Sequence, residues 1–367
     1  MEKIMRKFIL FIVFLFPYLA FADNLDPYLL DAMKTYKVPV VGYAIIDDFK
    51  IVSIQTISID PAIKVNTHSL FQAASISKSL SAYGALKLVE NNKIKLDEPA
   101  NSYLKKWKIN ESLFGNNHPV YIRNLMDMTS GLSVSGFAGY KQDQKMPNLL
   151  QILKGEAPAN NLPIKLFYAP GSQYFYSGGA FEVLQEVIEE VSGQPFETYM
   201  NQKILKSLEM NDSIFQYPLN ASYEKLAIPA IDGWKNYPEL AAAGLWSTPN
   251  DLAKFILSLS ESYLGKSNSL SKKLAQQMLT RHKNTDFGLG VVVGGKGKNL
   301  YFWKAGHNQG YHSLMIMFPK QGKGLVFMTN SETGNELINY IVPIVAHDDH
   351  WPYYFPFFDE LIMMPDF

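Results

Sequence analysis

Residues 68–107, HSLFQAASISKSLSAYGALKLVENNKIKLDEPANSYLKKW, contain the pattern on which the prediction of the fold depends. Ser75 and Lys78 form a Ser-x-x-Lys pair at the start of an expected helix, whose apolar residues recur at helical spacing. The same pattern also occurs elsewhere in the chain, at Ser102/Lys105, Ser222/Lys225 and Ser269/Lys272. The pair by itself is therefore not decisive, and the surroundings of each copy have to distinguish them.

The setting of Ser75 suits a nucleophile. Residues three apart lie on one face of a helix, so the Lys78 side chain is expected beside the Ser75 hydroxyl. A serine hydroxyl needs such a base, and a lysine can serve if burial or a neighbouring cation lowers its pKa. A helix start also favours a developing oxyanion through its free N–H groups. The other pairs lie in expected loops, helix ends or polar links, which leaves Ser75 as the candidate nucleophile.

The segment around Ser75 closely resembles the nucleophile segment of the serine β-lactamase and penicillin-binding-protein superfamily, in its class C β-lactamase-like branch. The family's Leu-Asp-x-Pro and Tyr-Leu elements match residues 96–99 and 103–104. Four further blocks follow in the family's order: YIRNLMDMTSGL at 121–132, APGSQYFYSGG at 169–179, AAAGLWSTPNDLAKF at 241–255 and WKAGHNQGYHSLMIMFP at 303–319. The resemblance covers roughly residues 25–345.

This resemblance implies a role for each matching position. Ser75 would be the acylated nucleophile, and the role of the base is divided between Lys78 and Tyr176. Lys304, in the triplet that matches the family's Lys-Thr-Gly motif, would supply a cation beside the phenol and attract a substrate carboxylate. The backbone N–H groups of Ser75 and His307 would form the oxyanion hole.

Two positions depart from the family's pattern. Gly178 replaces the asparagine of the Tyr-x-Asn motif, whose amide bridges the lysine and the substrate's amide group. Ala305 replaces the hydroxyl residue of the third motif, ahead of Gly306. These three residues belong to the expected substrate-binding positions. The departures weaken the case for β-lactams and peptides and give more weight to esters or altered amides.

The expected fold is α/β (α+β): an antiparallel sheet flanked by N- and C-terminal helices, with an inserted, mostly helical lobe, as in the β-lactamase and transpeptidase fold. Strand-forming runs lie at 40–46 and 50–59, joined by a hairpin at Asp47-Asp48, and return late in a meander. The late runs are 287–295, 299–306, 312–319 and 324–331. The sheet lobe is expected at about 25–70 and 285–345, and the helical lobe at about 75–260.

Helical periodicity appears in several segments of the chain. Residues 26–36 form a short amphipathic pattern, and 180–193 form the clearest one, with Gly193 placed as its C-cap. A further helix is expected over 250–260 with Asn250 as its N-cap. Residues 336–347 are expected to close the domain as a helix.

The two ends of the chain carry separate signals. Residues 1–22 have a basic start, a short apolar stretch and a small-x-small site, which predict a cleavable signal peptide and a mature start near Asp23. We therefore expect a bacterial protein that is secreted or periplasmic, with no transmembrane segment after cleavage. The chain contains no cysteine, which excludes disulfides and thiolate sites. Residues 346–367 are expected to be an aromatic tail packed on the body, and the alternative is a surface anchor for a partner or a membrane.

Composition narrows the partners. The chain has 34 basic and 34 acidic residues and no basic block, so a nucleic-acid partner is not expected. No cofactor is expected. No metal site is expected either, because neither His307 and His312 nor the pair His347/His350 is joined by a third ligand in the sequence. The chain lacks the Gly-x-Ser-x-Gly pattern of α/β-hydrolases.

The sequence therefore predicts an exported serine hydrolase that forms an acyl-enzyme at Ser75. Its substrate would be a small molecule or a peptidoglycan-type compound: a β-lactam, a D-amino-acid peptide or a small ester. The alternative hypothesis is a catalytically weak relative that binds cell-wall fragments or a protein partner, which Gly178 motivates. The oligomeric state stays open.

Overall fold

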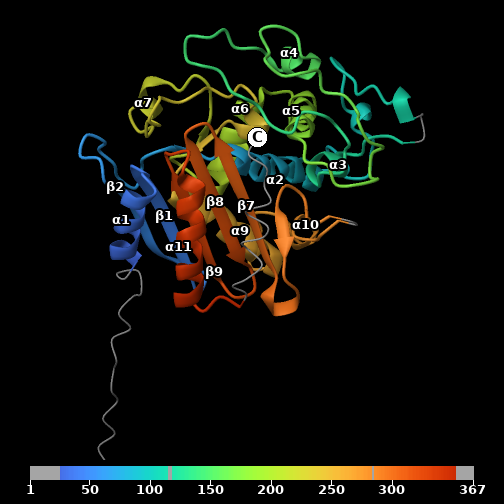
Figure 1. Ribbon diagram of the computed structural model, residues 1–367. Helices are drawn as coiled ribbons and strands as arrows, with labels where there is room; N and C mark the ends of the chain where they lie inside the picture. The colour runs from blue at the N-terminus through green and yellow to red at the C-terminus, as the bar shows by residue number, and fades with distance from the viewer. Residues whose placement is uncertain (1–24, 115–117, 283–284, 353–367) are drawn as a thin grey trace, which may run out of the picture.

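A six-stranded antiparallel sheet forms the centre of the molecule, in the order β2-β1-β9-β8-β7-β6 (Figure 1). The computed structural model describes residues 25–114, 118–282 and 285–352. The strands are β1 (Val40–Asp47), β2 (Lys50–Ser58), β6 (Val292–Gly294), β7 (Tyr301–Asn308), β8 (Tyr311–Phe318) and β9 (Lys323–Thr329). The predicted antiparallel sheet, with strands from both parts of the chain, is confirmed.

The first hairpin joins the late meander by pairing β1 with β9. Val41 lies opposite Thr329, so the N-terminal strands complete a sheet whose other members are far away in sequence. The hairpin between β1 and β2 turns at Asp48 and Phe49, one residue later than the predicted Asp47-Asp48. Both turn residues have positive φ, 46° and 59°, as a two-residue hairpin with right-handed strand twist requires.

Helices cover both faces of this sheet. α1 (Leu25–Thr35) and α11 (Gly334–Asp348) pack against each other, with α11 on β8 and β9, in front of the sheet in Figure 1. α9 (Pro249–Leu264) packs against β1, β8 and β9 from behind. This helix therefore belongs with the sheet, although its residues up to about 260 were expected in the helical lobe.

The N-cap of α9 differs from the prediction. The helix begins at Pro249, and the Thr248 hydroxyl accepts a hydrogen bond from the Asp251 N–H at 3.2 Å. Asn250, the predicted cap, lies inside the first turn. Proline suits the first helical position because its missing N–H would have no partner there, and this moves the cap to the preceding threonine. The predicted C-cap at Gly193, directly after α5 (Gly178–Ser192), is confirmed by its left-handed conformation.

The helical lobe lies above the sheet in Figure 1 and is built around α2 (Ser77–Glu90) and α5 (Gly178–Ser192). α2 is buried on nearly all sides and packs against α5 and the short α8. The other helices are α3 (Ile122–Met126), α4 (Leu149–Lys154), α6 (Phe196–Tyr199), α7 (Ala221–Glu224), α8 (Leu240–Ala243) and α10 (Lys272–Met278). Buried apolar side chains from the sheet and from these helices form one continuous core.

A second, small sheet was not predicted. It has the order β3-β5-β4, formed by β3 (Phe71–Gln72), β5 (Leu245–Ser247) and β4 (Ile214–Phe215). Strands of two or three residues leave no alternation that a sequence pattern can reveal. β3 ends at Gln72, shortly before Ser75, and the Ala73 N–H donates to the Leu245 carbonyl at 2.9 Å. It therefore anchors the segment that leads to the candidate nucleophile.

The predicted signal peptide, residues 1–22, and the tail beyond residue 352 lie outside the described residues. Trp351, near the start of the predicted tail, is buried and its ring lies 5.3 Å from that of Phe318 at the end of β8. Within the described ranges, every helix is too short or too polar to cross a bilayer.

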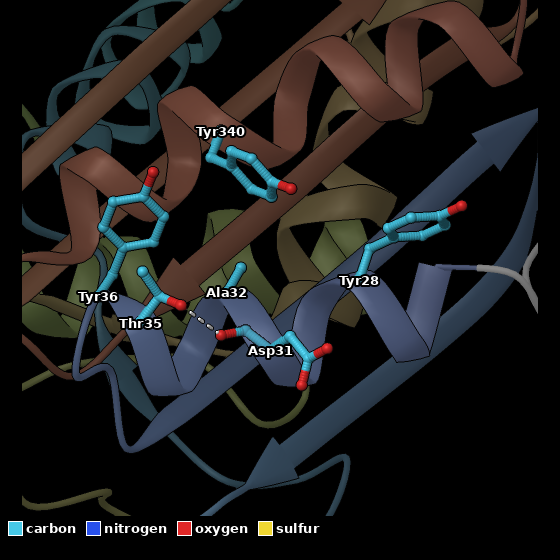
Figure 2. Close-up of a pocket in the computed structure, with 6 residues that line it drawn as sticks. All are labelled: Tyr28, Asp31, Ala32, Thr35, Tyr36 and Tyr340. Carbon is cyan, nitrogen blue, oxygen red and sulfur yellow. Dashed lines mark hydrogen bonds between the residues drawn. The ribbon is translucent and has the colours of Figure 1, made fainter.

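A shallow groove lies between α1 and α11, on the outer side of the sheet (Figure 2). Its volume is about 470 Å³, and its lining consists of Tyr28, Asp31, Ala32, Thr35, Tyr36 and Tyr340. None of the predicted catalytic residues lines this groove.

Candidate active site

Ser75 lies in a single 3-10 turn, Ala74–Ile76, that runs directly into α2. Ala74 has a φ of 50°, a left-handed value that a residue with a Cβ rarely adopts. The Ser77 hydroxyl secures this turn, since it donates to the Ala74 carbonyl at 2.5 Å and accepts from the Leu245 N–H at 3.0 Å. Such local strain, held in place by its surroundings, is common at functional sites.

The predicted residues Ser75, Lys78, Tyr176 and Lys304 form one hydrogen-bonded chain. Lys78 Nζ donates to Ser75 Oγ at 2.9 Å, and the Tyr176 hydroxyl donates to the same oxygen at 3.1 Å. Lys304 Nζ donates to the Tyr176 oxygen at 3.2 Å. Three segments distant in sequence, the start of α2, the start of α5 and β7, therefore meet in one hydrogen-bonded network.

Lys78 is held inside the protein. Its side chain is 2% exposed, and Nζ also donates to the Ala242 carbonyl at 2.9 Å. Burial lowers the pKa of Lys78, and the nearby charge of Lys304 lowers it further, while Tyr176 acts in the opposite direction. A lysine in this state can present a neutral amine that accepts a proton from the Ser75 hydroxyl.

Lys304 approaches Tyr176 from the sheet. It lies in the middle of β7, is fully buried, and its ammonium group faces the Tyr176 ring at 5.0 Å from the centroid. Burial lowers the pKa of Lys304 to about 7. Tyr176 itself is fixed by the helix that follows, because Ser177 caps α5 by accepting a hydrogen bond from the Ala180 N–H at 2.9 Å.

Gly306 allows β7 to approach the nucleophile turn. A Cβ at this position would lie 2.4 Å from the Ala73 carbonyl oxygen and 2.9 Å from the Ser75 backbone nitrogen, which only a glycine avoids. The turn is also tied to β8, where the Ser313 hydroxyl donates to the Ala73 carbonyl at 2.9 Å. This contact brings β7, the strand of His307 and the partly buried Ala305, alongside Ser75. Sequence reasoning missed Ser313, because only the strand pairing places it here.

Gly178 is the first residue of α5, and the space for a side chain there is already filled. A Cβ would lie 2.9 Å from the Ser135 carbonyl oxygen and 3.0 Å from the Phe137 ring. The Gly178 N–H donates to the same carbonyl at 3.0 Å. The space that an asparagine side chain would need is thus filled by the loop of residues 133–137, which packs closely over the start of the helix.

A buried acid behind Lys78 was also missed. Glu182 lies one turn beyond Gly178 on the same face of α5, is fully buried, and accepts from the Ala242 N–H at 3.1 Å. The carbonyl of Ala242 is the group that holds Lys78 Nζ, so one residue links the acid to the lysine. Burial raises the pKa of Glu182 well above its ordinary value, and the buried Glu239 raises it further. Burial therefore favours the uncharged form of Glu182. In the predicted helix 180–193, Glu182 lies on the polar face with Gln185 and Glu186, opposite the apolar residues, so the sequence pattern gave no signal for its burial.

Aromatic rings adjoin the hydrogen-bonded chain. The Phe287 ring lies 6.3 Å from that of Tyr176 and 5.5 Å from that of Tyr174, which is partly exposed. We call Phe137, Tyr174 and Phe287 the aromatic flank. It gives the side of the site next to Tyr176 an apolar character.

The chain belongs to the β-lactamase family, whose model matches residues 25–342. This match confirms the resemblance inferred from the sequence. This family supports a hydrolase of the serine β-lactamase type.

Curated relatives are distant. Protein flp of Staphylococcus aureus is 22% identical over 315 residues, which is 79% of this chain and 57% of the relative. The putative penicillin-binding protein PbpX of Bacillus subtilis is 24% identical over 76% of this chain and 66% of its own. The chain thus spans little more than half the length of Protein flp.

Solved structures share the fold. The octameric penicillin-binding protein homologue from Pyrococcus abyssi has a TM-score of 0.72 at 22% identity, covering 89% of this chain and 77% of its own. The β-lactamase/D-alanine carboxypeptidase from Yersinia pestis, complexed with citrate, has a TM-score of 0.66 at 18% identity, covering 88% and 99%.

Proposed function

We propose that this protein is a serine hydrolase that forms an acyl-enzyme at Ser75. The observation that carries the proposal is the convergence of Lys78 Nζ and the Tyr176 hydroxyl on Ser75 Oγ, at 2.9 and 3.1 Å. In acylation, the Ser75 proton passes to neutral Lys78 while Oγ bonds to the substrate carbonyl carbon. The N–H groups of Ser75 and His307 bind the resulting oxyanion.

The second half of acylation and the turnover step use the same groups. The tetrahedral intermediate collapses, and the leaving oxygen takes a proton through Tyr176, which Lys78 and Lys304 flank. A water molecule then gives a proton to this network while its oxygen attacks the acyl carbon. The bond between the acyl carbon and Ser75 Oγ breaks, Oγ takes the proton from the network, and the acid is released. Each proton transfer in this cycle uses side chains of the protein.

Among the three substrate classes, the site best suits a small ester with an apolar acyl group. β-Lactams and D-amino-acid peptides present an amide group that the family's asparagine would bind. Here the Ser135 carbonyl and the Phe137 ring fill the space next to Gly178, and Ala305 offers only a methyl group. An ester needs no such amide partner, and the aromatic flank supplies apolar surface for its acyl chain.

A hydrolysis panel on the mature chain tests this function. We expect turnover of p-nitrophenyl butyrate to exceed that of nitrocefin and of a D-Ala-D-Ala peptide. Ser75→Ala should lose hydrolysis and covalent labelling by a fluorophosphonate probe. Ser222→Ala is the matched control, because it alters an exposed Ser-x-x-Lys pair of the same spacing, Ser222/Lys225, and should retain both. Equal labelling of wild type and Ser75→Ala would refute the assignment.

The same panel separates the alternative, a relative that binds without turnover. Such a protein would label slowly or not at all and would hydrolyse none of the substrates. Peptidoglycan fragments would then be the first ligands to test. Robust ester turnover that depends on Ser75 disposes of this alternative.

We also propose that the protein is exported, to the periplasm or the medium of a bacterium. The proposal rests on the signal-peptide pattern of residues 1–22. Expression of the full chain in a bacterial host should give a mature protein outside the cytoplasm whose N-terminal sequence begins near Asp23. An intact N-terminus in the cytoplasmic fraction would contradict export.

A further inference from the structure

Two histidines and a glutamate converge on the side of the sheet that faces away from Ser75. His307 lies on β7, His312 lies opposite it on β8, and Glu332 follows β9 just before α11. One ligand atom from each of the three lies within 4.8 Å of the other two. Because side chains alternate along a strand, His307 points away from the face that carries Lys304 and Gly306.

The two imidazole rings and the carboxylate lie close together. The imidazoles of His307 and His312 are stacked, with centroids 4.3 Å apart and planes 7° apart. Glu332 Oε2 lies 3.0 Å from His307 Nε2. The other oxygen, Oε1, accepts the Gly310 N–H at 2.5 Å, so the turn between β7 and β8 orients the carboxylate.

One residue of the cluster is buried, and the other two are accessible to solvent. His312 is only 8% exposed, and its backbone N–H donates to Thr329 Oγ1 at 3.3 Å. His307 and Glu332 are exposed. A buried imidazole beside two accessible ligands leaves an entry path for an ion and room for water as an additional ligand.

We propose that His307, His312 and Glu332 bind a divalent transition-metal ion, Zn²⁺ by preference. Two imidazoles and one carboxylate form a three-ligand set that zinc sites with an open position use. Imidazole nitrogens favour zinc and its neighbours over Mg²⁺ and Ca²⁺, which prefer oxygen. Zinc–nitrogen bonds are about 2.0–2.1 Å long and lie in the plane of the imidazole ring, so the exposed His307 ring would have to turn out of its stacked position for both histidines to bind one ion.

The alternative to a metal site is a simple hydrogen bond between His307 and Glu332, with the His312 ring stacked on that of His307. The chain provides a matched example of that arrangement. His68 Nδ1 lies 2.9 Å from Asp212 Oδ2, a close histidine–carboxylate pair that belongs to none of the three-ligand groups found among the described residues. Comparison of the two pairs therefore tests whether the third ligand, His312, creates a site.

Equilibrium dialysis of the untagged mature chain against Zn²⁺, with metal analysis of the retained protein, measures the binding. We expect one Zn²⁺ per chain that excess Mg²⁺ does not displace. Glu332→Gln, an exposed and nearly isosteric change, and His312→Asn should each weaken binding by at least about tenfold. His68→Ala should bind as the wild type does.

Thermal unfolding provides a readout that is independent of catalysis. Zn²⁺ should raise the Tm of the wild type and of His68→Ala and leave that of Glu332→Gln unchanged, because a ligand that binds only the folded state stabilises it. Retention of one Zn²⁺ by Glu332→Gln and His312→Asn alike, or no retention by the wild type, would overturn the proposal. Neither readout depends on whether Ser75 is a nucleophile.

Discussion

Two buried lysines next to a single tyrosine give the candidate site its chemical character. Lys78 and Lys304 both face the Tyr176 ring, and burial lowers the pKa of each. A neutral amine is the form that accepts a proton, so the burial that opposes charge also creates a base. The same burial opposes folding, because the unfolded chain can protonate these lysines freely.

Lys304→Met should therefore stabilise the protein while it abolishes hydrolysis. The pKa of Lys304 falls from 10.5 to about 7, so the unfolded chain binds the extra proton throughout that pH range. The free energy of unfolding of the wild type therefore rises with pH between about 7 and 10.5. Below pH 7 the buried Lys304 destabilises the folded state by its full amount. At pH 6 we expect the variant to gain roughly 2–4 kcal/mol in the free energy of unfolding. Urea titrations should show this gain shrinking toward pH 10, and a gain independent of pH would contradict the cause.

Glu182 should act through its uncharged form. It accepts the Ala242 N–H, and the Ala242 carbonyl holds Lys78, so loss of the acceptor should let this lysine drift from Ser75. Glu182→Ala should lower the kcat for ester hydrolysis by at least about tenfold, since it leaves a buried N–H unpaired. Glu182→Gln keeps a carbonyl oxygen and needs no charge, so its kcat and its pH profile near neutrality should match the wild type. An equal loss in both variants would indicate that the carboxylate charge is required.

At the scale of elements, the start of α5 and loop 133–137 form one unit. Ser177 caps the helix and its hydroxyl donates to the Ser133 carbonyl at 3.1 Å, while Gly178 and Gly179 lie against the backbone of the same loop. The glycines allow the loop to pack where the family has a side chain. The departure from the family's motif is therefore a property of two segments together.

Gly178→Asn alone should not restore the family's amide. Its Cβ would meet the Ser135 carbonyl and the Phe137 ring, so we expect a destabilised protein with ester turnover reduced and no gain on nitrocefin. Gly178→Asn combined with Phe137→Ala relieves the contact with the ring and should raise the ratio of nitrocefin to ester turnover above that of Phe137→Ala alone. An unchanged ratio in the double variant would show that the missing amide does not set the substrate preference.

At the scale of the whole molecule, the C-terminal segment completes the central sheet and covers one of its faces. β9 inserts between β1 and β8, α11 then packs on the outer side of the sheet against α1, and Trp351 packs on Phe318. The C-terminal region is thus needed for the sheet that carries Lys304 and His307, although it lies far from Ser75 in sequence.

Trp351→Ala should weaken this closure. Removal of a buried tryptophan side chain costs about 3 kcal/mol in cores of this kind. We expect Trp351→Phe, which keeps an aromatic ring against Phe318, to lose less than half of that amount. Thermal unfolding measures both, and kcat of the folded variants should stay at the wild-type value. Equal stability of Trp351→Ala and the wild type would show that Trp351 does not contribute to this closure.

The sequence by itself determined the class of fold, the family and four residues that meet in one site. Helical and strand periodicity depend on local spacing, and Ser75, Lys78, Tyr176 and Lys304 each stand in a block with its own recognisable pattern. Only the tertiary structure decided what surrounds them. The loop against Gly178, the acid behind Lys78 and the meeting of Glu332 with His307 and His312 all join residues that are distant in sequence. Spacing along a chain carries no information about such contacts, because they are fixed by the packing of one element against another.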